Sequence, residues 1–311
     1  MANFGICFSK DFVGENPLSH TGAKLPVYLE FLKMCQKEGW GVYVLTRKTY
    51  SGNGIFKGAW VFEAEGKFRR ILSPVRIDLV YDRAGGIAFP PKEDEDTIFV
   101  NRRDFKLLCW DKWKAYLEAG EHMPRTFWVG NGEALQEVLP KITTDWVVLK
   151  PVNGLKGKGI FVGTKKDALN FKFLGEKPRY IAQEFVDTGQ GVSGIVAGLH
   201  DIRLAMVNNK IVWSHVRTPP PGSYKSNVAA GGTLKEIPID IIPEKVKHIA
   251  RDISGKFYRE YDNPVYSLDF GVMAGKAYLF EINDQIGFPT SGMDNKDDFL
   301  AEMIKNFKEK L

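Results

Sequence analysis

The chain has 311 residues, of which 44% are hydrophobic and 26% are charged, and its formal net charge is +5 at pH 7. This composition predicts an ordered protein with two or three hydrophobic cores. The scattered basic residues do not favour a nucleic-acid surface. No run of about 18 apolar residues is present, which excludes a membrane-spanning helix, and the first ten residues do not resemble a secretion signal. The three cysteines form no C-x-x-C pair, which is typical of reduced thiols in a cytoplasmic protein without a zinc site.

The first hundred residues alternate between strand-like and helix-like segments. We expect strands at 4–8, 41–46 and 77–81, a helix at 26–38, and a hairpin of 58–62 with 68–71 around Glu65-Gly66. Such alternation predicts a small α/β domain, which we place at residues 1–105.

Two further units follow along the chain. An amphipathic helix is expected from about Asp111 to Gly120, and a strand at 146–150 belongs to a unit that we place at residues 106–182. The last unit, residues 183–311, is rich in strand-like segments and closes with a helix at 296–308.

A glycine-rich segment follows the strand at 146–150. Gly154, Gly157 and Gly159 allow backbone N–H groups to turn toward an anion, and Lys150, Lys156 and Lys158 add positive charge. The spacing fits neither the Walker A motif nor G-x-G-x-x-G, and the residues that follow are strand-like. The segment therefore predicts either a phosphate-binding loop or a plain glycine-rich hairpin.

A second informative segment, residues 266–283, forms two apolar runs joined by the turn Ala274-Gly275-Lys276. Side chains two residues apart on a strand share a face, so Glu281 and Asn283 are expected side by side with Asp269 opposite them. Two carboxylates and an amide oxygen suit a hard cation such as Mg²⁺. A solvated surface hairpin is the alternative, although acids among such apolar neighbours need a partner.

Three more segments carry polar residues at strand ends. The strand-like run that starts at Tyr180 ends in Gln183 and Glu184, followed by Phe185 and Val186. Asp201 and Arg203 share a strand face, and Arg217 and Asn227 come before the acidic hairpin.

The order and spacing of these segments resemble the ATP-grasp superfamily of carboxylate–amine ligases, especially the branch with bacterial glutathione synthetase and the enzyme that adds glutamates to a ribosomal protein. The resemblance covers about residues 98 to 290 and implies an α/β N-terminal domain followed by two α+β subdomains that grip ATP. It implies that Lys112 and Lys150 are the two ATP lysines and that Gly157 and Gly159 belong to the phosphate loop. The resemblance also implies a hinge, whose backbone reads adenine, at Gln183, Glu184, Phe185 and Val186.

The resemblance assigns the remaining residues as follows. Asp201 would hold the ribose hydroxyls, while Asp269, Glu281 and Asn283 would bind two Mg²⁺ ions, or Mn²⁺, that clamp the triphosphate. Arg217 and Asn227 would reach the transferred phosphoryl group and the acyl intermediate. Taken alone, Arg203 could simply pair with Asp201, and Lys112 could be an exposed helix residue.

The expected function is an ATP-dependent ligase that joins a small-molecule or peptide carboxylate to an amine through an acyl phosphate and releases ADP and phosphate. The alternatives are a kinase on the same fold, which makes a stable phosphate ester, and a non-catalytic nucleotide-binding protein of a cell envelope or spore coat. The expected partners are these substrates, not a membrane or nucleic acid, and a homo-oligomer is left open. Arg83, at the end of the strand at 77–81, is a candidate for binding the acceptor acid. Alternatively, Arg83 forms a salt bridge with Asp82 or with residues 93–96.

Overall fold

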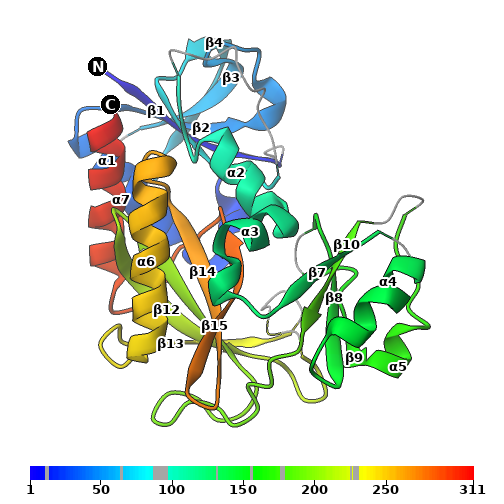
Figure 1. The fold of residues 1–311 in the computed structure, drawn as a ribbon. Coiled ribbons are helices and arrows are strands. Elements are labelled where there is room, and N and C mark those ends of the chain that lie inside the picture. Colours follow the sequence, from blue (N-terminus) through cyan, green and yellow to red (C-terminus); the bar gives the residue numbers. More distant parts are fainter. Residues whose placement is uncertain are drawn as a thin grey trace.

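The computed structural model describes residues 1–10, 14–63, 66–86, 97–130, 132–154, 157–175, 179–224, 226 and 231–311. Within these ranges the strands form three sheets of six, four and five strands (Figure 1). None of the described helices is both long and apolar enough to cross a membrane.

The N-terminal sheet has the strand order β4-β3-β2-β1-β5-β6. Its centre is parallel, with β1 between β2 and β5, whereas β3 and β4 form an antiparallel hairpin at one side. The predicted α/β layer and hairpin are confirmed, although the strand expected at 77–81 begins two residues later, and residues 64–65 lie outside the described ranges. The strand bounds are β1 (Asn3–Phe8), β2 (Gly41–Thr46), β3 (Ile55–Phe62), β4 (Phe68–Arg76), β5 (Leu79–Asp82) and β6 (Ile98–Val100).

The two ends of the chain share one hydrophobic core. The short 3-10 helix η1 (Ser19–Lys24) leads into α1 (Leu25–Lys37), and the C-terminal helix α7 (Lys296–Lys310) lies beside α1 in Figure 1. The ring of Phe307 lies 5.4 Å from that of Phe4 and 6.0 Å from that of Phe31. Aromatic burial of this kind stabilises the contact between the first strand and the last helix.

Two helices connect the N-terminal sheet to the rest of the chain. α2 (Arg103–Trp110), which the sequence analysis did not predict, is followed directly by α3 (Lys112–Ala119). The Asp111 carboxylate accepts hydrogen bonds from the backbone N–H groups of Trp113 and Lys114, at 3.0 and 3.1 Å. This N-cap explains why α3 begins where the sequence predicts.

The four-stranded sheet has the order β7-β10-β8-β9 and stands to one side of the molecule with its two helices (Figure 1). Strands β8 and β9 are antiparallel, so the predicted strand–loop–strand arrangement around the glycines is confirmed. Its elements are β7 (Thr126–Val129), α4 (Gly132–Val138), β8 (Trp146–Pro151), β9 (Phe161–Thr164), α5 (Lys165–Ala168) and β10 (Tyr180–Glu184).

The five-stranded sheet is antiparallel and has the order β13-β12-β11-β14-β15. The predicted hairpin is confirmed as β14 and β15, whose turn residues Ala274 and Gly275 have φ values of 49° and 74°. The elements are β11 (Asp201–Val207), β12 (Lys210–Thr218), β13 (Thr233–Glu236), α6 (Glu244–Glu260), β14 (Tyr266–Met273) and β15 (Lys276–Asn283).

Candidate functional site

The three predicted metal ligands lie together on the hairpin of β14 and β15. Asp269 stands opposite Glu281 in the strand register, Ser267 stands opposite Asn283, and the Asn283 amide donates to Asp269 Oδ2 at 3.3 Å. Within the described ranges no three His, Cys, Asp or Glu side chains are placed to hold a metal ion. A cation here would therefore take the Asn283 oxygen and non-protein ligands besides two carboxylates, which is a donor set that fits Mg²⁺.

Asp269 is also the centre of a buried ion-pair network. Arg203 donates two hydrogen bonds of 2.6 Å to its carboxylate, and Arg217 donates a third of 2.9 Å. Burial alone would raise the pKa of Asp269, but the two guanidinium groups hold this pKa below its usual range. Asp269 therefore stays charged although its side chain is buried.

The pairing of Asp201 differs from the alternative considered in the sequence. Arg217 Nε, and not Arg203, donates to Asp201 Oδ1 at 2.6 Å, because Asp201 and Arg217 face each other in the register of β11 and β12. The second oxygen of Asp201 accepts a hydrogen bond from Ser226. Burial raises the pKa of Asp201 despite the nearby Arg217.

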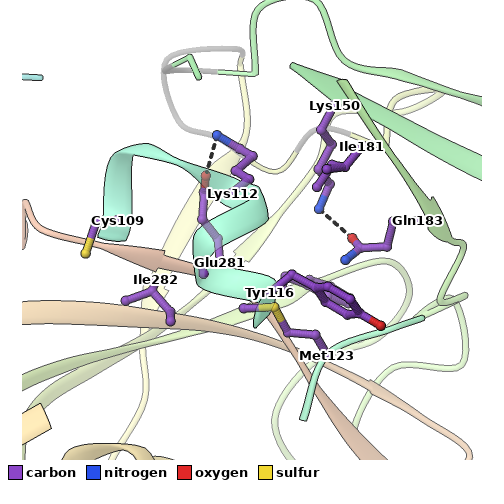
Figure 2. A pocket seen from close by; sticks show the side chains of 11 residues that line it. Cys109, Lys112, Tyr116, Met123, Lys150, Ile181, Gln183, Glu281 and Ile282 are labelled. Carbon is purple, nitrogen blue, oxygen red and sulfur yellow. Dashed lines mark hydrogen bonds and ion pairs between the residues drawn. The ribbon is translucent and has the colours of Figure 1, made fainter. Parts of the chain in front are cut away.

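Lys112 connects α3 to the acidic hairpin. Its ammonium lies 3.3 Å from Glu281 Oε1 (Figure 2). It also donates to the backbone oxygen of Gly154 at 3.1 Å. The side chain is 13% exposed. Lys112 is thus held inside the site and is not an exposed helix residue.

Lys150 extends from β8 toward β10, where its ammonium donates to Gln183 Oε1 at 2.7 Å (Figure 2). The pKa of Lys150 is lowered to about 8: burial is the main cause, Glu281 partly opposes it, and the nearby Lys112 adds to the lowering. A lysine with this pKa is charged near neutral pH and has one strong hydrogen-bond partner that is neutral. Both features suit a lysine that binds an anionic ligand.

The glycine-rich segment turns as predicted at the positions that the structure describes. Gly157 and Gly159 have φ values of 68° and 74°, a region that other residues rarely adopt. A Cβ atom at Gly159 would lie 2.8 Å from Leu174 and 3.0 Å from Pro151. Lys158 is exposed, whereas Lys156 lies outside the described residues.

A cavity of about 160 Å³ lies between the four-stranded sheet and the five-stranded sheet. Its walls are mostly apolar, which suits a flat heterocyclic ring, and polar groups stand at its ends. All four predicted hinge residues and Asp201 line it. The lining comprises Pro124, Val148, Lys150, Ile160, Val162, Gln183, Glu184, Phe185, Val186, Thr188, Leu199, His200, Asp201, Pro219, Tyr224, Ser226 and Phe280.

The hinge residues differ in what their polar groups already bind. The Glu184 carboxylate accepts from the backbone and hydroxyl of Thr143, and the Glu184 N–H donates to the Arg125 oxygen. The Phe185 N–H donates to Thr144 Oγ1 at 3.2 Å. Among the described residues no hydrogen bond uses the Val186 N–H, so this donor is open to a ligand in the cavity.

His200, Tyr224 and Phe280 are among the residues of this cavity that the sequence analysis did not predict. His200 Nδ1 lies 3.0 Å from the Gly198 oxygen, while its Nε2 is buried and has no partner among the described residues. With its proton on Nδ1, His200 presents an acceptor at Nε2. The position of His200 directly before Asp201 in the sequence was the signal that could have identified it as a residue of this cavity. Asn227, the other predicted catalytic residue, lies outside the described residues.

Arg83 does not form the salt bridge with Asp82 that the sequence analysis considered. It donates to the Ile286 oxygen at 2.5 Å and to the Tyr81 hydroxyl at 3.1 Å. Asp82 instead pairs with the buried Lys106 at 2.9 Å. Residues 93–96, the other proposed partner, lie outside the described ranges.

The RimK-like ATP-grasp domain family matches residues 109–307 of this chain, which is more than half of its length. The match contains both lysines, the hinge and the acidic hairpin described above. The chain therefore belongs to the RimK-like ATP-grasp family.

Among curated proteins, a probable alpha-L-glutamate ligase of Coxiella burnetii is 29% identical over 196 residues, covering 61% of this chain and 59% of the relative. N-acetylaspartylglutamate synthase A of Homo sapiens is 25% identical over 197 residues, covering 61% of this chain and 46% of that protein. The matched part thus spans less than two thirds of either relative.

Solved structures resemble the whole chain. D-cycloserine synthetase DcsG aligns with a TM-score of 0.65 at 13% identity, covering 99% of both chains. A RimK domain ATP-grasp protein from Sphaerobacter thermophilus aligns with a TM-score of 0.61 at 14% identity, covering 98% of this chain and 99% of the other. At such identities the likeness establishes the fold, and the chain has the ATP-grasp fold expected from its sequence.

Proposed function

We propose that this protein is an ATP-dependent carboxylate–amine ligase. The observation that carries the proposal is the pairing of Lys112 with Glu281 at 3.3 Å, since it brings one cation of α3 onto the acidic hairpin. Lys150 of the four-stranded sheet lines the same narrow pocket (Figure 2) and also the larger cavity. Cations and oxygen ligands at the mouth of an apolar cavity suit a nucleotide triphosphate.

The cavity supports a specific orientation of ATP. The adenine ring would lie between Val148, Ile160 and Phe280, with the Val186 N–H and His200 Nε2 available for its polar edge or for the ribose. Both oxygens of Asp201 already accept hydrogen bonds, so a ribose contact through Asp201 requires Ser226 to give way. Lys112 and Lys150, with the loop at Gly157 and Gly159, would hold the phosphates.

Asp269, Glu281 and Asn283 would hold magnesium, and two ions are proposed. The metal would offset the negative charge of the phosphates when bound. In the first step the acceptor carboxylate attacks the γ-phosphorus of ATP, which gives an acyl phosphate and ADP. An amine then attacks the acyl carbon, phosphate leaves with the bonding electrons, and the nitrogen loses a proton. Arg217, a rigid fork beside Asp269, would stabilise the charge that develops on the acyl oxygens, together with Asn227.

Several relatives support an acid and an amine as substrates, because the names of the curated relatives describe a probable alpha-L-glutamate ligase and an N-acetylaspartylglutamate synthase. Another similar structure, ATP-grasp ligase PsnB, was solved with Mg and ADP.

We propose a cytoplasmic enzyme, with the domains at 1–105, 106–182 and 183–311.

The test traps the acyl phosphate. Purified protein with ATP, Mg²⁺ and a pool of amino acids and short peptides receives hydroxylamine in place of the amine. A ligase yields a hydroxamate and ADP, because hydroxylamine intercepts the activated acyl group. A phosphate ester that survives hydroxylamine would establish a kinase instead. Tight ATP binding without any acceptor-dependent ADP would favour the non-catalytic alternative.

A further inference from the structure

Two cations near the start of α1 and the end of β5, Lys24 and Arg83, have no acidic partner among the residues that the structure describes. The ammonium of Lys24, the last residue of η1, forms no hydrogen bond or ion pair with any residue that the structure describes. Arg83 donates to neutral groups, the Ile286 oxygen and the Tyr81 hydroxyl, and its buried Nε has no partner among the described residues. Partly buried cations without a counter-charge are costly unless a ligand supplies one.

These two cations lie close to the functional face of the five-stranded sheet. A Cβ atom built at Gly287 would lie 3.5 Å from Lys24 Nζ and 3.4 Å from Cζ3 of Trp213 on β12. Lys24 therefore approaches Trp213 where Gly287 has no side chain. Burial lowers the pKa of Lys24, and Arg83 and Arg203 lower it further, which agrees with the three cations lying near one another.

The polar groups beside this cluster are also short of partners. The ring of His215 lies 4.5 Å from that of Trp213, and its Nδ1 has no partner among the described residues. Burial, with Arg203 and Arg217 nearby, holds the pKa of His215 well below its ordinary value. His215 is thus neutral at physiological pH and can donate or accept a hydrogen bond next to the cations.

The acids of this region that the structure describes already pair with other cations. Asp269 binds Arg203 and Arg217, and Asp201 binds Arg217. Asp82 and Asp284 share Lys106, at 2.9 and 2.8 Å. The positive charge of Lys24 and Arg83 consequently remains without compensation by the described residues.

We propose that Lys24 and Arg83 form an anion site, here called the junction cluster, that binds a second anionic group of the acceptor acid. This inference rests on the proposed ligase function. Trp213 and Arg217 are four residues apart on β12, which is roughly 13 Å along a strand. The carboxylate activated beside Arg217 and the anion held at Lys24 are therefore different groups of one substrate. The substrate class is an acidic amino acid or a peptide that carries one, with a carboxylate as the second anion.

The first experiment measures occupancy of the junction cluster without turnover. Wild-type protein is acetylated with trace acetic anhydride, and the rate of acetylation at Lys24 is measured by mass spectrometry. Six compounds are added one at a time, as three pairs of an acidic compound and its neutral partner: glutamate and glutamine, aspartate and asparagine, and phosphoserine and serine. Acidic members are expected to slow acetylation of Lys24 at least about threefold, whereas their neutral partners and the exposed Lys33 on α1 show no change. Protection by phosphoserine alone would replace carboxylate by phosphate and overturn the stated class. Equal rates with all six compounds would overturn the anion site.

The second experiment measures ADP release by Lys24→Gln and by its control Lys33→Gln, which removes the same charge from the exposed face of α1. Lys24→Gln should lower kcat/KM for the acidic acceptor about ten- to a hundredfold, change it less than about threefold for the neutral partner, and leave KM for ATP unchanged. An equal loss for both acceptors would overturn the anion site. Protection of Lys24 without any ADP release would retain the site and overturn the ligase proposal. ADP release without protection of Lys24 would retain the ligase proposal and overturn the anion site.

Discussion

Arg203 on β11 and Asp269 on β14 face each other in the strand register and share two parallel hydrogen bonds of 2.6 Å. A planar guanidinium fits a carboxylate in this way, so the geometry of Asp269 is set by protein groups. One of the proposed magnesium ligands is therefore already oriented by the fold.

Removal of this guanidinium should destabilise the protein. Arg203→Gln leaves the buried Asp269 with only part of its compensation, so the free energy of unfolding in urea at pH 7 should fall by about 3 kcal/mol. Asp269 has a depressed pKa in the folded state, so its stabilising contribution is present above its unfolded pKa of about 4 and is lost as the pH falls below it. The difference between wild type and variant should shrink in that acid range. A difference that stays constant down to pH 2 would contradict this account.

The Glu281 carboxylate should be essential for turnover and not for folding. Glu281→Gln keeps the shape and removes a charge that we assign to metal binding, so acceptor-dependent ADP release should fall at least about a hundredfold. Binding of Mn²⁺ in the presence of ATP, measured by electron paramagnetic resonance, should weaken in parallel. The control is Glu137→Gln on the exposed face of α4, which should be active. Wild-type turnover by Glu281→Gln would remove the proposed metal site.

Lys150 should make ATP affinity depend on pH. Its pKa of about 8 in the free protein means that the ammonium is lost as the pH rises through 8, so the Kd for ATP should increase between pH 7 and pH 9. Lys150→Ala should weaken ATP binding about ten- to a hundredfold at pH 7 and flatten this pH profile. Calorimetric titration measures both effects. An unchanged Kd in the variant would mean that the glycine-rich segment is a plain hairpin.

Lys106 should hold the N-terminal sheet to the loop that follows β15. Its ammonium lies between Asp82 and Asp284, and although burial opposes the charge, these two acids raise the pKa of Lys106. Lys106→Met leaves the buried Asp82 and the partly buried Asp284 without their shared cation and should cost about 3–5 kcal/mol of unfolding free energy. The exposed pair of Lys308 with Glu38 provides the contrast, since Lys308→Met should cost less than about 1 kcal/mol. Similar urea midpoints for the two variants would argue against a structural role for the buried triad.

Local sequence patterns were enough to predict the acidic hairpin, the glycine-rich turn and the start of α3. Each depends on neighbours within a few residues: alternation along a strand, glycine at positive φ, and Asp111 as an N-cap. Four of the described α-helices were missed: α2, the short α4 and α5, and the long α6.

The sequence by itself determined that Lys112, Lys150 and Glu281 lie at the ends of predictable elements, and the resemblance to ATP-grasp ligases predicts that they bind ATP and a metal. Only the tertiary structure decided which charges pair. Arg203 binds Asp269, and Arg217 also binds Asp201, because strand order and register bring them together. Lys24 reaches the same face from the start of the chain and is left without a counter-charge among the described residues. Ion pairs between residues far apart in sequence depend on long-range packing, which local periodicity does not encode.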